Sequence, residues 1–357
     1  MNMSKLYFVC PDDNIPYGGI RFIYRCVDTL NAAGVSATVV HAKNGFRCTW
    51  FENATPITPA SDVHFATGDL LVIPEFYREK IPHIAPGVPH VIFNQNPHDT
   101  FPAVTDFNAG AWKPVTSSDT IGIVANSPYT SEYLRYCFPR LSIHEVTLGI
   151  DQMIFHPPRS EKQRAIAFMP RKRRMDLSQV LRILELRGAL DGWELWAIEN
   201  MTERETADVL RRSAVFLSLN EREGLGLPPL EAMASGCIVV GYHGGCGRLY
   251  MRENTAIAVD DGEIVTFASQ VESVLGRYGS DEELSRMCRN AIAMIEEEFA
   301  MKKESAEVVR VFGGALGTVA TMEPARVRLN PELLVGRQPS RLKSAISLLQ
   351  RAVDRES

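Results

Sequence analysis

The chain has 357 residues, of which 45% are hydrophobic and 23% charged, and its formal net charge is −5. These values are typical of a globular protein long enough for two domains, and the acidic balance gives no support for wholesale nucleic-acid binding. Seven scattered cysteines, none in a CxxC pair, favour a reduced, cytoplasmic chain over a disulfide framework. We expect neither a signal peptide nor a membrane-spanning helix, because no apolar run is long enough for either.

The chain opens with a unit of alternating apolar and helical patterns. A strand over residues 5–10 leads into a turn that carries Gly18 and Gly19, and a helix over 20–33 and a strand over 36–41 follow. This order predicts the start of a doubly wound α/β domain. Glycines between a strand end and a helix start allow a phosphate or sugar to come close, although a plain tight turn has the same composition.

Polar side chains follow the later strands of this half. Strands are predicted over residues 69–74, 90–93, 121–125 and 143–148, and Ser127 is suited to cap the helix that follows the third of them. Two of these strands end in polar residues, which are Asn94, Gln95, Asn96, His98 and Asn126. Because the carboxyl ends of parallel strands form the binding edge of such a sheet, we expect this group at an active site.

A proline-containing segment near residues 155–159 is typical of a linker and precedes a second α/β series. Its first strand, over residues 165–169, ends in four consecutive cations, which are Arg171, Lys172, Arg173 and Arg174. Such a run at a strand end suits a pyrophosphate clamp, although most basic runs are solvated turns. Further strands over 193–198 and 214–219 alternate with helices, so the sequence predicts two doubly wound domains that face each other.

The segment over residues 220–247 carries the strongest pattern. Glu223 and Glu231 are separated by seven residues that include two glycines and two prolines, and a helix is predicted over 229–235. A helix start favours an anion such as a phosphate, while ionised carboxylates accept hydrogen bonds from hydroxyls. The combination predicts a nucleotide-sugar site. A strand over 237–240 and a second glycine loop follow, in which Cys246 is predicted to pack as a small residue rather than to react.

The end of the chain is different. A short strand over residues 256–259 and two helices, over 264–278 and 281–299, complete the second series. After residue 318 no clear period appears until 341–353, where a narrow apolar stripe has a basic face. This stripe is compatible with peripheral contact with a membrane, and also with packing on the chain itself or on a second subunit, which its narrow width favours.

The Glu223-x7-Glu231 spacing within EGLGLPPLEAMASG resembles the signature of retaining, nucleotide-sugar-dependent glycosyltransferases of the GT-B fold, of the family 4-like kind. The glycine loop at Gly18 and Gly19 and the strand-end Arg171 resemble further parts of that family. The likeness covers roughly residues 5–315 and does not reach the tail. It implies an acceptor-side Rossmann-like domain over residues 1–157, a nucleotide-sugar-binding Rossmann-like domain over 158–300, a helix over 301–317 that crosses back, and a tail over 318–357.

The resemblance also implies roles for single residues. Glu231 would accept hydrogen bonds from the ribose hydroxyls, and the donor would also contact Gly18, Gly19, Lys172, Arg174 and the backbone N–H groups of Leu225, Gly226 and Leu227. Glu223 would hold a hydroxyl of the donor sugar, Arg171 would neutralise the departing diphosphate, and His98 would complete the catalytic set. The acceptor side would consist of Asn94, Gln95, Asn96 and Asn126.

Three family positions differ in this chain. Arg248 stands near the position where the family commonly has a glutamate after the second glycine loop. The lysine that the family carries about five residues after its arginine is Asp176 here, so Lys172, Arg173 or Arg174 replaces it. The family often has a histidine at the end of a strand of the first domain. Here that strand ends in Asn94-Gln95-Asn96 and His98 follows, so either His98 or Asn96 lines the sugar pocket.

The implied function is transfer of a sugar with retention from a UDP- or GDP-sugar to a glycan, lipid-linked or other hydroxyl acceptor in bacterial surface polysaccharide or glycoconjugate synthesis. We expect a cytoplasmic protein, or one at the inner face of the membrane, that needs no metal or other cofactor and binds no nucleic acid. The alternatives are a nucleotide-sugar epimerase of the same fold and a non-catalytic nucleotide-sugar-binding subunit.

Overall fold

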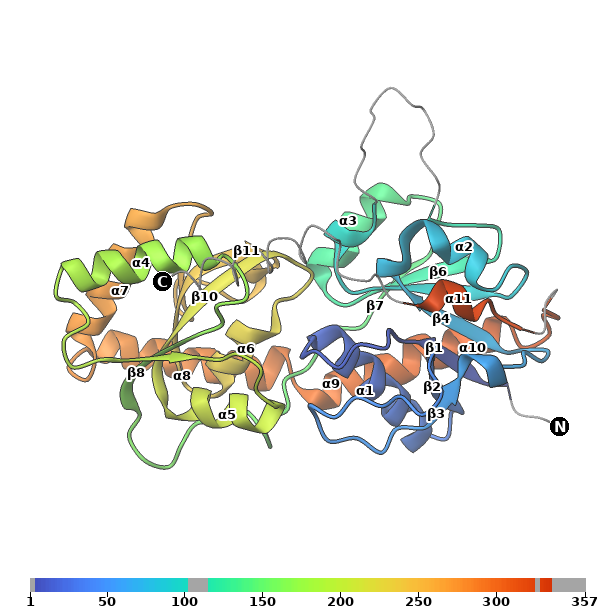
Figure 1. Ribbon diagram of the computed structural model, residues 1–357, viewed down its shortest axis with the longest axis horizontal. Helices are drawn as coiled ribbons and strands as arrows, with labels where there is room; N and C mark the ends of the chain where they lie inside the picture. The colour runs from blue at the N-terminus through green and yellow to red at the C-terminus, as the bar shows by residue number, and fades with distance from the viewer. Residues whose placement is uncertain (1–3, 102–114, 325–327, 336–357) are drawn as a thin grey trace, which may run out of the picture.

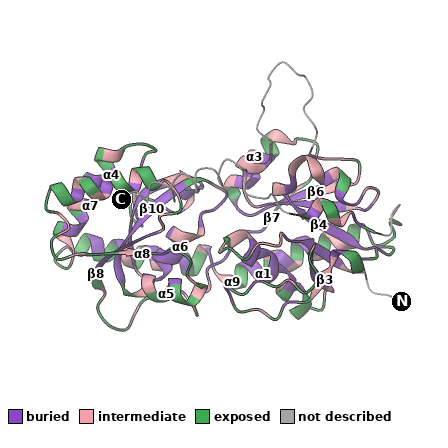
Figure 2. Cartoon of the chain, in the orientation of Figure 1, coloured by how far each residue is buried: buried purple, intermediate pink, exposed green. Residues whose placement is uncertain are grey.

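The computed structural model describes residues 4–101, 115–324 and 328–335, and folds into two domains that each contain one parallel sheet (Figure 1). Buried residues are concentrated on the strands, as the purple segments of Figure 2 show. Strands buried on both faces are typical of parallel sheets covered by helices. The predicted α/β class with two doubly wound domains is therefore confirmed.

The first sheet has seven parallel strands in the order β3-β2-β1-β4-β5-β6-β7. Their bounds are β1 Leu6–Val9, β2 Ala37–His41, β3 Ile57–Pro59, β4 Leu70–Pro74, β5 His90–Asn94, β6 Thr120–Ala125 and β7 Ile143–Glu145. The strand order reverses between β1 and β4, and doubly wound sheets bind ligands at such a switch point.

Helices and short helical turns connect these strands. They are α1 Gly18–Ala32, η1 Ala60–Asp62, η2 Glu75–Lys80, α2 Ile81–Ile84, η3 Pro97–Asp99 and α3 Pro128–Cys137. The side chain of Ser127 accepts the N–H of Thr130 at the start of α3, so the predicted cap is confirmed.

The second sheet has five strands in the order β12-β11-β10-β8-β9. Its elements are β8 Gln163–Phe168, α4 Arg174–Leu186, β9 Glu194–Ala197, α5 Glu203–Arg212, β10 Ser213–Glu223, α6 Leu227–Ala234, β11 Ile238–Gly245, η4 Cys246–Leu249, β12 Ile257–Val259, α7 Ile264–Arg277 and α8 Glu282–Glu298. Apolar residues of α4 and α7 form the core on one face of this sheet, and those of α5 and α6 form the core on the other.

Several boundaries differ from the predicted ones for identifiable reasons. Strands β10 and β11 run longer than predicted because their ends pair, with Glu223 opposite Gly245. Helix α6 begins earlier, at Leu227, because Gly226 takes a left-handed conformation with φ of 77° and turns the chain there. Helix α4 likewise begins directly after a left-handed residue, Arg173, with φ of 46°. The short strand β3 was not predicted, and the predicted helix over 341–353 lies outside the described residues.

The end of the described chain packs on the first domain. After α8 come α9 Met301–Val308, the π-helical turn η5 Val309–Gly313, α10 Gly314–Thr318 and, further on, α11 Pro331–Leu334. A β-bridge joins Ile150 to Ala300, and the fully buried ring of Phe312 lies 5.0 Å from that of Phe8 and 5.4 Å from that of Phe93, between ring centroids. The core of the first domain is therefore closed by a segment that comes after the second domain in the chain.

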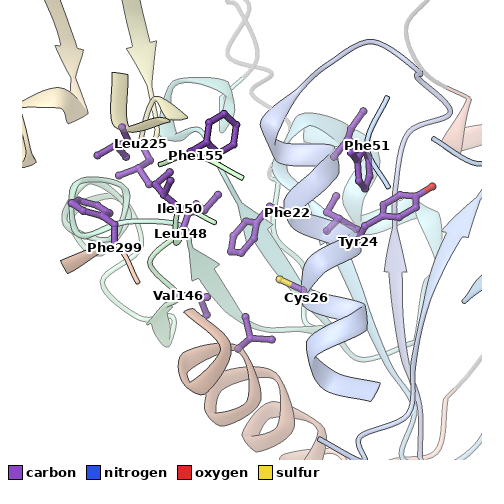
Figure 3. Close-up of a cluster of buried hydrophobic side chains, with 14 of the residues drawn as sticks. Phe22, Tyr24, Cys26, Phe51, Val146, Leu148, Ile150, Phe155, Leu225 and Phe299 are labelled. Carbon is purple, nitrogen blue, oxygen red and sulfur yellow. The ribbon is translucent and has the colours of Figure 1, made fainter. Parts of the chain in front are cut away.

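One apolar cluster runs through the contact between the domains (Figure 3). It includes Phe22 of α1, Phe155 from the connection between the domains, Leu225 before α6 and Phe299 after α8, all of them buried. Apolar contacts of this kind resist separation, because opening the domains would return this surface to water.

We predict that Phe312→Ala lowers the free energy of unfolding by about 3–5 kcal/mol, the usual loss when a large buried ring is removed. The measurement is urea unfolding of the whole chain followed by circular dichroism. The matched control is Tyr136→Ala on α3, where an aromatic ring that is 90% exposed is removed. Equal losses for the two variants would show that Phe312 does not contribute to the core as the packing indicates.

Candidate functional site

The starts of α1 and α6 meet at the contact between the domains. A Cβ added to Gly18 would lie 2.5 Å from Leu227 Cδ1, so the start of α1 lies directly against the Leu227 side chain at the start of α6. Neither helix begins with a side-chain cap. Each helix start has backbone N–H groups without an intrahelical partner and a partial positive charge. The sequence therefore brings two anion-attracting helix starts to one place, as the glycine loop and the Glu223-x7-Glu231 segment predicted.

Two of the four consecutive cations reach the same place. The guanidinium of Arg171 donates to the Pro16 carbonyl at 3.2 Å and lies 4.7 Å from the centre of the Tyr17 ring, next to the start of α1. The ammonium group of Lys172 contacts the carboxylate of Glu223. Burial, and to a smaller extent the neighbouring Arg171, lowers the pKa of Lys172 to about 8.

The other two cations have different partners. Arg173 lies 4.9 Å from the centre of the Tyr242 ring and pairs with Asp176 and Asp261. The side chain of Arg174 is 70% exposed and lies 3.5 Å from Glu199. Of the three candidates for the family lysine, the structure thus brings Lys172 to Glu223, and it places Arg174 outside this group.

The loop before α6 is held by a residue that the sequence did not single out. The hydroxyl of buried Tyr250 lies 2.9 Å from the Leu225 carbonyl oxygen and 3.0 Å from that of Gly226, and Asn220 donates to it at 3.1 Å. In a planar trans peptide the carbonyl and the following N–H point in opposite directions. The N–H groups of Gly226 and Leu227 therefore point away from Tyr250, which leaves them free to meet a ligand.

Gly224 connects this loop to the first domain. Its carbonyl accepts the Ser127 hydroxyl at 2.6 Å, and a Cβ added to it would collide with the carbonyl oxygen of Gln95. Asn126 donates to that same Gln95 oxygen at 2.7 Å, and a Cβ added to Gly19 would lie 2.9 Å from Gln95 Oε1. Gln95 and Asn126, predicted for the acceptor side, thus form part of the contact between the domains.

The remaining strand-end residues separate into two groups. Asn94 is fully buried as the last residue of β5 and donates to Thr100 at 2.7 Å, so it lies in the core and not on the predicted acceptor surface. The side chain of Asn96 is occupied by His98 N–H at 3.2 Å and by Asp99 at 3.1 Å.

His98 differs from Asn96, because its ring reaches toward the second domain. Its Nε2 lies 3.1 Å from the hydroxyl of Tyr129, against which Gly245 of the second domain packs. Burial, followed by the charge of Arg222, lowers the pKa of His98 and favours the neutral ring. A neutral imidazole carries one donor and one acceptor nitrogen, and can therefore contact a sugar hydroxyl in either role.

Glu75 is a second residue that the predicted site did not include. It follows β4 directly and is only 6% exposed; its Oε1 accepts the Asn96 N–H at 2.9 Å, and its buried Oε2 has no hydrogen-bond partner in the described chain. Burial raises the pKa of Glu75 to about 8. The carboxyl is thus protonated at neutral pH and sits under the loop that meets Gly224.

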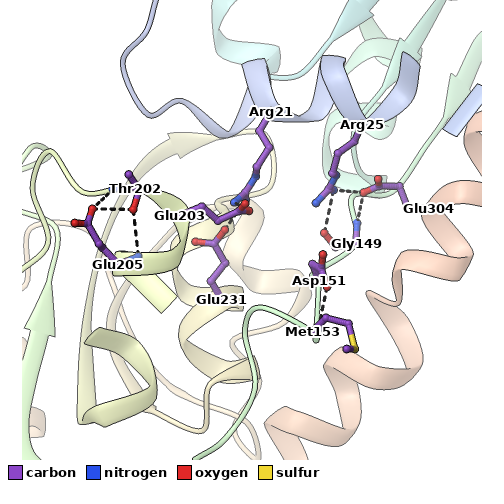
Figure 4. A network of polar contacts seen from close by, with 10 residues as sticks. All are labelled: Arg21, Arg25, Gly149, Asp151, Met153, Thr202, Glu203, Glu205, Glu231 and Glu304. Carbon is purple, nitrogen blue, oxygen red and sulfur yellow. Dashed lines mark hydrogen bonds and ion pairs between the residues drawn. The ribbon is translucent and has the colours of Figure 1, made fainter. Parts of the chain in front are cut away.

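Glu231 is 5% exposed, and its Oε1 lies 2.5 Å from Arg21 Nη2 of α1 (Figure 4). The second member of the motif is thus paired with the opposite domain, which the sequence did not predict.

Other candidates for site chemistry have structural explanations. Cys246 is fully buried, and burial raises its pKa to about 12, which confirms the packing interpretation. Asp12, which follows β1, accepts the N–H groups of Ala42 and Lys43 after β2 at 3.0 and 2.8 Å. Among the residues in the structure's described ranges, no three His, Cys, Asp or Glu side chains are grouped to hold a metal ion. Within those same ranges, no helix has the length and apolarity needed to cross a membrane.

The chain is similar in sequence to known glycosyltransferases. Residues 197–294 match the family model described as glycosyl transferases group 1. The alpha-1,6-glucosyltransferase of Actinobacillus pleuropneumoniae serotype 7 (strain AP76) is 28% identical over 306 residues, which cover 80% of this chain and 88% of that enzyme.

Two solved structures share the fold at 12% identity. Sucrose-phosphate synthase from Thermosynechococcus elongatus has a TM-score of 0.62 and is matched over 88% of this chain and 100% of its own. Anabaena Alr3699/HepE in complex with UDP-glucose has a TM-score of 0.61, with coverage of 87% and 99%. Residues 197–294 are thus similar to glycosyl transferases group 1, and the two-domain fold of the chain is GT-B.

We predict that Glu75→Gln changes how stability depends on pH. The folded wild-type chain keeps the Glu75 proton up to a pKa of about 8, whereas the unfolded chain releases it near 4.5. Between these values the folded state binds more protons, so this group's contribution to stability is complete below pH 4.5 and is lost as the pH rises through 8. The unfolding free energy of the wild type minus that of Glu75→Gln should fall across this window, by at most about 1.4 kcal/mol per pH unit.

The measurement is urea unfolding at several pH values, with the exposed Glu132→Gln as control. Glu132→Gln should follow the wild type at every pH. Parallel curves for wild type and Glu75→Gln would show that the Glu75 carboxyl is not held protonated by the fold.

Proposed function

We propose that this chain is a retaining glycosyltransferase that moves a sugar from a nucleotide-diphosphate donor to a hydroxyl acceptor, with UDP-glucose as the first candidate donor. The observation that carries the proposal is the meeting of the uncapped starts of α1 and α6 with the cations Arg171 and Lys172. Two helix starts and two cations suit a diphosphate. The similarity to an alpha-1,6-glucosyltransferase and the UDP-glucose bound to a protein of the same fold support glucose and uridine, and a GDP-sugar is the second candidate.

In this proposal the diphosphate lies between the two helix starts. The N–H groups of Gly226 and Leu227 bind it from the second domain, and the glycines Gly18 and Gly19 let the first domain come close. As the glycosidic bond breaks, negative charge grows on the leaving diphosphate. Arg171 and Lys172 are already in place to stabilise that charge, and such preorganised groups lower the barrier most effectively.

The two motif glutamates act as acceptors and not as nucleophiles. Glu223, in contact with Lys172, holds a hydroxyl of the donor sugar, while Glu231 accepts from the ribose hydroxyls. The pair of cations neutralises the leaving group, so we propose that no divalent metal and no other cofactor is needed. His98 serves the sugar pocket in preference to Asn96, whose side chain is occupied within its own turn.

We propose that the acceptor is a glycan or a lipid-linked sugar of bacterial surface polysaccharide or glycoconjugate synthesis, used at or near the inner face of the membrane. Part of the chain, over 111 residues, is 32% identical to a lipopolysaccharide core biosynthesis mannosyltransferase of Rhizobium leguminosarum bv. viciae, which supports this class of acceptor.

The proposal is tested by incubating the protein with UDP-glucose and a panel of glycan acceptors in excess chelator. UDP-glucose is an α-glycoside, so retention gives an α-linked product, identified by the anomeric coupling in proton NMR. A β-linked product would overturn retention, and complete loss of activity that magnesium restores would overturn metal independence. Conversion of the donor without acceptor would favour an epimerase, and binding without turnover of any acceptor would favour a non-catalytic subunit.

We also predict that Arg171→Ala and Glu231→Ala affect different kinetic constants. Arg171 acts on charge that develops in the transition state, so its loss should lower kcat by about 10²–10³-fold. Glu231 acts on the nucleotide in both states, so its loss should mainly raise the KM for the donor, by about tenfold or more. Steady-state kinetics at varied donor concentration separates the two effects. Unchanged kinetics in both variants would remove the assignment of this pocket.

A further inference from the structure

Arg21 of α1 is a charged residue buried between the domains (Figure 4). It is 7% exposed, and its guanidinium lies 5.9 Å from the centre of the Trp50 ring and 6.0 Å from that of Phe155. Its Nη1 contacts the carboxylate of Glu203 on α5, and its Nη2 lies 2.5 Å from Oε1 of Glu231 on α6. Both carboxylates belong to the second domain, so one arginine of the first domain holds two helices of the other.

The pairing with Glu231 leaves that carboxylate able to bind a ligand. An ionised carboxylate has two oxygens and about four acceptor positions. Arg21 contacts the Glu231 carboxylate through Oε1. Oε2 therefore keeps its capacity to accept hydroxyl hydrogen bonds, while the bond to Arg21 fixes the rotation of the group.

Glu203 fixes the other side of the guanidinium. Its carboxylate contacts Nη1 of Arg21, and its backbone N–H donates to the Trp50 carbonyl of the first domain at 3.1 Å. The planar guanidinium can hold two carboxylates at once because its donors point in fixed directions. Arg21 is therefore oriented from one side and orients Glu231 on the other.

Arg25 provides a natural comparison one helical turn later. Its Nη2 contacts the carboxylate of Glu304 on α9 and donates to the Gly149 carbonyl at 3.1 Å. Both arginines lie on α1 and pair with a buried glutamate, but Glu304 is not part of the Glu223-x7-Glu231 motif. Variants of Arg21 and of Arg25 both lose a buried ion pair. If they differ in nucleotide binding, the difference therefore comes from the contact of Arg21 with the motif glutamate.

We propose that Arg21 is a positioning residue for the nucleotide: from the first domain it orients the Glu231 carboxylate of the second domain toward the ribose hydroxyls. This inference rests on the assignment of Glu231 to the ribose made above. Arg21 and Glu231 come from different domains, so the orientation exists only while the domains are in contact. Recognition of the ribose is thereby tied to the closed arrangement of the two domains.

The experiment compares Arg21→Met with the matched control Arg25→Met in the full chain. Isothermal titration calorimetry measures binding of UDP and of 2′-deoxy-UDP, and the readout is the ratio of the two dissociation constants. The wild type should prefer UDP by about tenfold or more, the usual effect of one hydrogen bond to a charged group. Arg21→Met should bring the ratio close to one, as Glu231→Gln should also do, whereas Arg25→Met should keep the wild-type ratio even where its melting temperature falls.

A second variant keeps the test decisive if Arg21→Met does not fold. Arg21→Lys retains the charge but lacks the planar fork that holds two carboxylates, so it should fold and should still lose most of the preference for UDP. The same titrations with GDP and 2′-deoxy-GDP cover a guanine donor.

The outcomes separate the inference from the proposed function. If the wild type binds neither UDP nor GDP, the proposed function fails and this inference with it. If the wild type and Glu231→Gln behave as expected but both Arg21 variants keep the wild-type ratio, the inference alone fails and Arg21 is a structural ion pair. Tighter UDP binding by Arg21→Met would also overturn it, since Arg21 would then obstruct Glu231.

Discussion

At the contact between the two domains the chain comes very close to its neighbours, because glycines at this contact have no side chain. Gly18 lies against the Leu227 side chain, and Gly224 meets the Gln95 carbonyl so closely that a Cβ on Gly224 would collide with it. Glycine costs conformational entropy elsewhere in a chain, but here it allows a hydrogen bond from Ser127 to the Gly224 carbonyl across the contact. The other features of the candidate site follow from this approach, since it brings the two helix starts together.

Charged residues gather where the backbones meet. Arg171 and Lys172 leave the end of β8, and Glu223 ends β10, its neighbour in the sheet, so the parallel topology alone places these three at one edge. Arg21 adds a cation from the other domain and is satisfied by two carboxylates. Burying a charge is costly unless it is paired. The closed contact can therefore hold these groups because each has a partner of opposite sign or a carbonyl oxygen.

The local parts of this arrangement could be predicted from the sequence, and the long-range parts could not. Strand and helix periods gave the two α/β series, and the position of glycines and cations at strand ends indicated the anion site. The choice among Lys172, Arg173 and Arg174 needed the structure, because the left-handed conformation of Arg173 sends neighbouring side chains to different partners. Arg21 pairs with a residue 210 positions away, a relation that no spacing rule reveals.

Under the proposed function, the same interactions make the closed arrangement a condition for donor binding. Separating the domains would break the Ser127 bond to Gly224, the contact of Arg171 with Pro16 and the pair of Arg21 with Glu231 at the same time. A ligand can shift an equilibrium between open and closed forms only by binding one of them better. In the proposed function, a nucleotide sugar meets this condition because its diphosphate lies between one helix start of each domain. Under that proposal, donor binding and domain closure are coupled in one equilibrium.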